Sequence, residues 1–186
     1  MGMDYEHAIT VNQKLGFARI LIDAAQQFAD NNEDAIPVRQ TVQAFLDGAI
    51  AQLNIALVYF TLEICEIKLP ADAVTENTLT HVLRVANQRN INNALLRELE
   101  LLLKQLSWLR DFIECYHNPQ YLTKLFSENN QKNNPSAQLQ SEPAVLATDR
   151  NPSIGPIPAA PIPTITSWLI NIQNLVERHR SQAVEE

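Results

Sequence analysis

Three observations predict an all-α protein. The longest apolar stretch, residues 36–69, has no proline between Pro37 and Pro70, and its apolar residues recur at steps of three and four along one helical face. The chain has only 4 glycines in 186 residues, too few for the many tight turns of an all-β protein. Hydrophobic residues make up 46% of it, enough for the core of one domain. We therefore expect a mostly antiparallel four-helix bundle, a Pro-rich linker and a fifth, C-terminal amphipathic helix.

Residues 36–69 are expected to form the central helix of this bundle. A second set of apolar residues widens the stripe, so most sides of the helix would be covered by neighbours. Pro37 suits a first helical turn, and Pro70 marks the exit. Polar residues such as Asp47 and Glu63 interrupt the apolar centre, whereas a membrane-spanning helix needs about 20 mostly apolar residues. We interpret the stretch as a buried core helix and expect no membrane span.

Three more helices complete the expected bundle, residues 1–127. The first is expected at 5–28 and ends in a polar turn. The next begins at Asp72 or Thr75 and reaches Asn87. After an Asn-rich break, a single leucine-rich helix is expected from residue 91 or 92 to Tyr116. A short helical turn at 121–126 would then pack on the bundle.

The composition changes at residue 128. Residues 128–163 are rich in Asn, Gln, Ser, Ala and Pro and have no apolar period, which predicts a flexible linker. Residues 164–186 are predicted to be helical again, with Thr166 or Ser167 as N-cap. An isolated helix of this length is marginal in water, so we expect its apolar face to dock on the bundle. The alternative is a groove on another protein. This face comprises Trp168, Leu169, Ile172 and Leu175.

Charge and cysteine usage favour a cytoplasmic protein. The net charge of −7 disfavours broad binding to nucleic acid or to an anionic membrane. The N-terminal ten residues carry acidic side chains and lack the pattern of a signal peptide. Cys65 and Cys115 lie in apolar helical stretches, as buried thiols in a reducing compartment do, with a structural disulfide as the alternative. The basic residues 178–180 are explained as cations near a helix C-terminus.

The sequence lacks a complete catalytic or metal motif, and we expect no cofactor. Glu114 and His117 form an E-x-x-H on a predicted helix, as in di-iron carboxylate bundles, and Glu63 and Glu66 would be further ligands. A full site of that kind needs a second E-x-x-H, which the sequence lacks. A metal site built from these four residues is therefore only an alternative.

Arg110 and His117 are separated by six residues, a spacing that resembles the R-x(4–6)-H signature of the HEPN superfamily of small helical nucleotide-binding domains, many of them ribonucleases. The resemblance implies that His117 is a general base and that Arg110 stabilises phosphate charge. Asn118 and Pro119 follow His117 in place of the continuation often seen in that family. The alternative is an i,i+4 pair between Arg110 and Glu114.

A second resemblance begins in the first predicted helix. The run from Asn12 to Ala18 reads N-Q-K-x-x-F-A and is similar to the opening of an uncharacterised helical family of pseudomonad-related proteobacteria, which carries only a domain-of-unknown-function label. The similarity extends to a Pro-rich linker and a final Ser-Trp-Leu helix. It implies a recurring plan of bundle, linker and C-terminal helix, and no catalytic residue.

Together these features predict a small cytoplasmic bundle that is not an enzyme and works through protein contacts or as a structural module. Its partner would be another protein or a second copy of the chain. The alternative is a HEPN-like ribonuclease or RNA-binding bundle that uses Arg110 and His117. The candidate interaction residues are Asn12, Gln13 and Lys14 in the first helix and Trp168, Leu169, Ile172 and Leu175 in the last.

Overall fold

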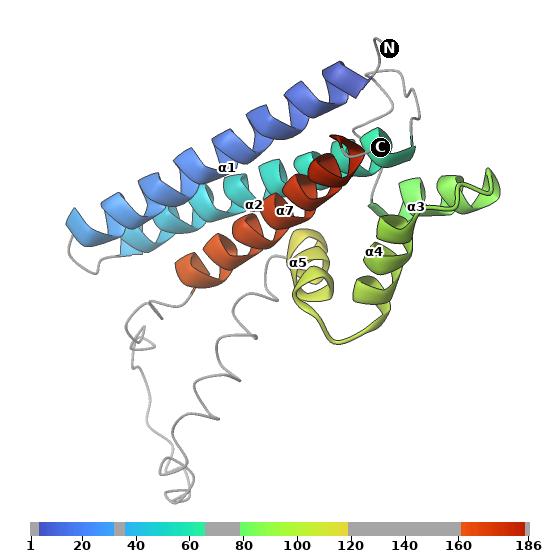
Figure 1. The fold of residues 1–186 in the computed structure, drawn as a ribbon. Coiled ribbons are helices and arrows are strands. Elements are labelled where there is room, and N and C mark those ends of the chain that lie inside the picture. Colours follow the sequence, from blue (N-terminus) through green and yellow to red (C-terminus); the bar gives the residue numbers. More distant parts are fainter. Residues whose placement is uncertain (1–3, 32–35, 66–78, 119–160, 185–186) are drawn as a thin grey trace, which may run out of the picture.

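The computed structural model describes residues 4–31, 36–65, 79–118 and 161–184, and every regular element among them is an α-helix (Figure 1). The predicted all-α class is confirmed for these residues. The expected linker, apart from its last three residues, and the expected turn at 121–126 lie outside the described residues, as do 66–69 at the end of the predicted central helix.

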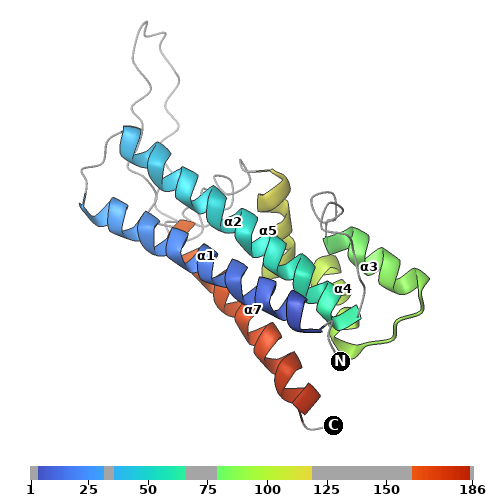
Figure 2. The same ribbon diagram turned by 90° about the horizontal axis from the view of Figure 1, so that it is seen from above.

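The dominant packing joins α1 (Asp4–Asn31) to α2 (Ile36–Cys65), which lie antiparallel and side by side (Figures 1 and 2). The two helices come close at Gly48, where an added Cβ would lie 3.3 Å from Cδ1 of Leu21. Small residues at such a position let two helix backbones approach. The buried residues of α1 recur at helical spacing and form its inner face: Val11, Leu15, Ala18, Ile22 and Ala25.

The C-terminal helix α7 (Pro161–Val184) packs against α1, α2 and α5. It begins three residues before the expected start, because proline is tolerated in the first helical turn, where amide donors have no helical partner. The expected N-cap at Thr166 or Ser167 is wrong. Both residues lie inside the helix, and their hydroxyls donate to the carbonyls of Ile162 and Thr164 at 2.8 and 2.9 Å.

Three short helices follow α2 in the chain: α3 (Leu79–Gln88), α4 (Ala94–Lys104) and α5 (Trp108–His117). Both α3 and α5 pack against α2, and α4 packs against α5. The Asn-rich break between α3 and α4 is confirmed. Asn90 adopts a left-handed φ of 56°, which asparagine tolerates, and the side chain of Asn93 caps α4 by accepting from the amide of Leu95.

The single leucine-rich helix expected up to Tyr116 is wrong, because it is divided into α4 and α5. Gln105 has an extended backbone, and Ser107 caps α5 by accepting from the amide of Arg110. The hydroxyl of Ser107 also donates to the carbonyl of Leu102 at 2.6 Å, which fixes the corner. The break leaves Leu106 92% exposed.

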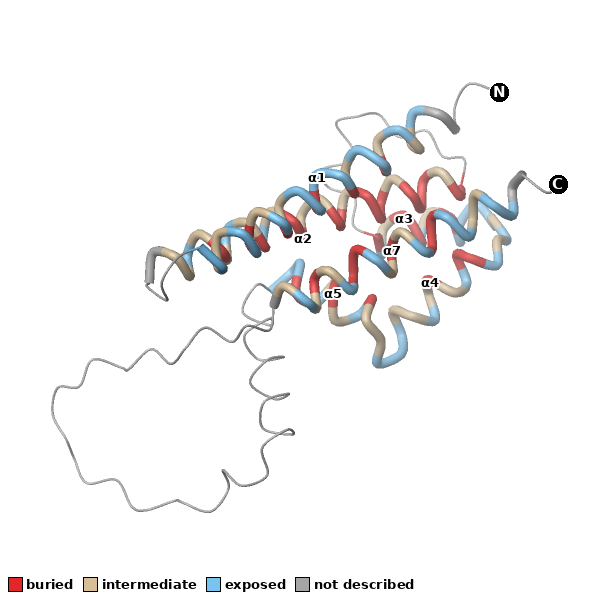
Figure 3. The backbone as a smooth tube through the Cα atoms, turned by 60° about the vertical axis from the view of Figure 1, so that its left-hand side comes forward, coloured by how far each residue is buried: buried red, intermediate tan, exposed pale blue. Residues whose placement is uncertain are grey.

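One hydrophobic core joins all six described helices. Buried residues recur along α2 and α7 in Figure 3. The ring of Trp168 on α7 meets that of Phe112 on α5 edge to face, with centroids 5.5 Å apart. The 28 residues Val38–Cys65 of α2 are long and apolar enough to cross a membrane, but 67% of their most apolar window is buried within the protein. Core helices and membrane-spanning helices can share this length and composition, so these two properties do not distinguish them here.

Candidate functional site

Arg110 and His117 lie on α5, and both are exposed. They are seven positions apart in the sequence, a rise of about 10 Å along the helix axis. Arg110 lines a groove of about 940 Å³ between α3, α4 and α5, together with Glu114, Arg84 and Lys104. His117 is not among the residues that line this groove, and its ring contacts that of Tyr116, with centroids 5.2 Å apart. The two residues of the HEPN-like pair therefore do not share this groove.

The four residues of the metal alternative are not assembled. Glu63 is engaged by Arg180, while Glu114 is exposed on α5, and Glu66 lies outside the described residues. Within the described ranges, no group of three or more His, Cys, Asp or Glu side chains could hold a metal ion.

Both cysteines are free and buried. Burial raises the pKa of the Cys65 thiol to about 11, against a smaller lowering by Arg89. Burial, reinforced by the negative charges of Asp111 and Glu114, raises the pKa of Cys115 to about 12. Both thiols are therefore protonated near neutral pH and are poor nucleophiles.

The guanidinium of Arg180 joins three helices. Its Nε and Nη2 donate to the two carboxylate oxygens of Glu63 on α2, each at 2.9 Å. Nη1 donates to Oδ1 of Asn12 at 2.9 Å, and Nη2 also donates to the carbonyl of Ala8 at 3.5 Å. We call these four residues the Arg180 network. The Glu63 side chain is only 9% exposed, so this two-pronged pair lies partly out of water.

The neighbours of Arg180 also contact specific partners. Nη2 of Arg178 donates to both carboxylate oxygens of Glu98 on α4, at 2.8 and 2.7 Å. The ring of His179 meets that of Phe60 edge to face. The sequence-based explanation of residues 178–180 by the helix dipole is corrected here, because α7 continues to Val184. The sequence contained a signal for the contact of Arg180, because Glu63 lies in the apolar α2 helix and a buried carboxylate needs a cation beside it.

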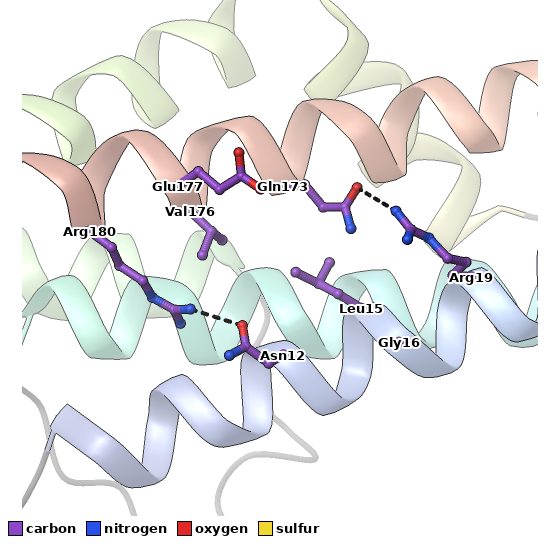
Figure 4. Close-up of a pocket in the computed structure, with 8 residues that line it drawn as sticks. All are labelled: Asn12, Leu15, Gly16, Arg19, Gln173, Val176, Glu177 and Arg180. Carbon is purple, nitrogen blue, oxygen red and sulfur yellow. Dashed lines mark hydrogen bonds between the residues drawn. The ribbon is translucent and has the colours of Figure 1, made fainter.

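A groove of about 440 Å³ lies between α1 and α7 (Figure 4). Arg180 hydrogen-bonds to Asn12 at one end, and Nη2 of Arg19 donates to Oε1 of Gln173 at 3.2 Å at the other. We call it the α1–α7 groove. It is lined by Asn12, Leu15, Gly16, Arg19, Gln173, Val176, Glu177 and Arg180.

Of the seven predicted interaction residues, one lines this groove, two lie elsewhere on α1 and four are buried in the core. Asn12 lines the groove, whereas Gln13 is exposed beside it. The ammonium of Lys14 lies 5.4 Å from the ring centre of Phe17 on the same helix. The predicted face of α7 is buried inside the protein, at Trp168, Leu169, Ile172 and Leu175.

Apart from Gln13, the sequence did not predict an interaction site on the solvent side of α1. Ile9, Gln13, Gly16 and Ile20 follow one another at steps of four, three and four residues, and all are exposed. We call these four residues the outer face of α1. Ile9 is 59% and Ile20 63% exposed. These large apolar side chains face solvent, although the inner face of the same helix is already packed.

Comparisons of the chain with protein-family models, curated proteins and solved structures find no match.

Proposed function

We propose that this protein is a cytoplasmic, non-enzymatic helical module that works through contacts with another protein. The single observation that carries the proposal is the exposure of two large apolar side chains, Ile9 and Ile20, on the outer face of α1, together with Phe17, which is also exposed on this helix. Singly exposed apolar residues are ordinary on a protein surface, whereas several on one helix are typical of an interaction site.

The chemistry of the described residues supports this class over an enzyme. The buried cysteines are protonated near neutral pH, and Glu63 is paired with Arg180. The apolar face of α7 packs within the same chain, so a partner would contact the surface that this packing leaves outside.

A wider architecture belongs to the same proposal. The described helices would be the bundle and returning C-terminal helix of the plan implied by the N-Q-K-x-x-F-A resemblance, with the linker between them. Arg180 supports this view, because its contacts join the last helix to both α1 and α2.

The second candidate is a HEPN-like ribonuclease or RNA-binding bundle. It is favoured by the three basic residues Arg84, Lys104 and Arg110 in the groove between α3, α4 and α5, where phosphates could be neutralised. The position of His117 outside that groove weighs against the ribonuclease form.

Native mass spectrometry of the protein purified from its own cells tests the first proposal against the second. We expect a complex of defined stoichiometry with another protein. RNA cleavage that is lost in His117→Ala and retained in the control variant His7→Ala would contradict the proposal and favour the ribonuclease.

A further inference from the structure

Gly16 is a glycine in the middle of a 28-residue helix. Glycine in a helix interior costs about 0.5–1 kcal/mol relative to alanine, so its presence there calls for a reason. At Gly48 the reason lies inside the protein, because an added Cβ would press on Leu21 of α1. At Gly16 an added Cβ would meet no atom within 4 Å.

The surroundings of Gly16 point to a contact from outside the chain. Gly16 lines the α1–α7 groove beside Leu15 and Val176, so a bare backbone and an apolar floor lie next to each other (Figure 4). Ile9 and Ile20 are exposed on the same face, one on each side of Gly16 along α1. A missing side chain between two apolar ones lets another helix approach the backbone closely.

From this juxtaposition we infer that the outer face of α1, centred on Gly16, docks a cationic amphipathic helix of another protein. The inference rests on the proposed function and names its surface and the class of its partner. Apolar side chains of the partner would contact Ile9 and Ile20, and its small residues would face Gly16.

Charge selects the cationic partner. Glu6 and Asp23 are exposed near the two ends of the outer face, and Glu177 is exposed on the α7 side of the groove. Of the two arginines that line the groove, Arg180 is paired with Glu63. The opposing charges are Arg19, bonded to the neutral Gln173, and Lys14, whose ammonium lies over the Phe17 ring, so the three carboxylates outnumber them. The whole chain carries a net charge of −7. Lysine or arginine flanking the apolar face of the partner would complement this surface.

The same charges disfavour a second copy of the chain as the occupant. An antiparallel pairing that places Ile9 against Ile20 of the other copy also places Glu6 against its Asp23. A two-fold interface makes each such contact twice. A parallel pairing sets each carboxylate near its own counterpart. Like charges facing each other weaken association.

Photo-crosslinking in the protein's own cells tests the inference on the full chain. The photoreactive residue p-benzoylphenylalanine replaces Gln13 on the outer face, Leu106 at the α4–α5 corner, or Ala44, an exposed control on α2. We expect position 13 to give an adduct with another protein whose crosslinked segment is a Lys/Arg-rich amphipathic helix. Position 44 should give no adduct above the unirradiated background.

A second variant separates docking from folding. Adding Gly16→Leu should lower the adduct yield at position 13 by about tenfold or more, because the side chain occupies the contact, while the unfolding temperature stays equal or rises. The matched variant Ala44→Leu should leave the yield unchanged.

The remaining outcomes each decide a point. An adduct of twice the chain mass, or a crosslinked segment that is acidic, would overturn the partner class. Adducts at position 106 without any at position 13 would overturn the docking surface and leave the proposed function standing. Adducts at neither position would overturn both. A yield unchanged by Gly16→Leu would overturn the role of Gly16.

Discussion

The two faces of α1 have the same kinds of residue in opposite situations. Ile22 on the inner face is 4% exposed, and Ile20, two residues earlier, is 63% exposed. Gly48 of α2, facing the inner side, is close to Leu21, whereas Gly16 on the outer side has open space where a Cβ would lie. The inner face is explained by this chain alone. The exposed isoleucines and the glycine of the outer face have no such explanation within the described residues, and a partner would account for them.

The largest expected difference in the free energy of unfolding is between variants of Ile22 on the inner face and Ile20 on the outer face. Ile22→Ala should lower the free energy of unfolding by about 2–5 kcal/mol, because it removes buried apolar contacts and leaves a cavity. Ile20→Ala should change it by less than about 0.5 kcal/mol, as exposed positions do. Urea denaturation of both variants measures the difference. Equal losses would mean that the outer face is packed within the protein.

The next comparison concerns the arginines of α7. Arg180→Ala should lower the free energy of unfolding by about 1–3 kcal/mol, because Glu63 would stay largely buried without its cation. Arg178→Ala should cost less than about 1 kcal/mol, since Arg178 and Glu98 are both well exposed. Thermal unfolding of the two single variants checks the order. A larger loss for Arg178→Ala would contradict the central role of the Arg180 network.

An effect of similar size is expected from filling the close contact at Gly48. Gly48→Leu should destabilise the protein by about 1–3 kcal/mol, because the new side chain must displace Leu21 between α1 and α2. Ala44→Leu, at an exposed position one turn earlier, should have little effect on the unfolding midpoint. If Gly48→Leu were as stable as Ala44→Leu, the contact would not restrict the size of this side chain.

The smallest effect on stability near neutral pH concerns the thiols. The raised pKa values keep Cys65 and Cys115 protonated in the folded state, so the native protein at pH 8 should react with a disulfide reagent far more slowly than the unfolded protein. Because the pKa of Cys65 is about 11 in the folded state against the usual 9.0, the free energy of unfolding should not depend on this thiol below pH 9 and should fall as the pH rises from 9 through 11. Fast labelling of the native protein in the absence of urea would contradict the burial.

Much of the fold could be predicted because apolar residues that recur at helical spacing are the ones that the fold buries. The stripe of α2 and the face of α7 both follow residues that the structure buries. The break between α4 and α5 was missed because the leucine period continues through Leu106, which the corner leaves in solvent. Ser107 was the available signal, since serine is a preferred N-cap.

The candidate site was less predictable. Asn12 was selected from its polar cluster, but its contact with Arg180 joins residues 168 positions apart, which periodicity cannot reveal. Gly16 became informative only when its surroundings were known, because the sequence alone does not distinguish it from Gly48. The remaining polar positions, Gln13 and Lys14, stay predictions as contact residues.

The most direct test of the central claim is the free energy of unfolding of Gly16→Ala, measured by urea denaturation of the isolated protein. Because the fold does not require a glycine there, the variant should be more stable than the wild type by about 0.5–1 kcal/mol. A less stable variant would show that Gly16 serves this protein's own packing, and it would contradict the placement of a partner at the outer face of α1.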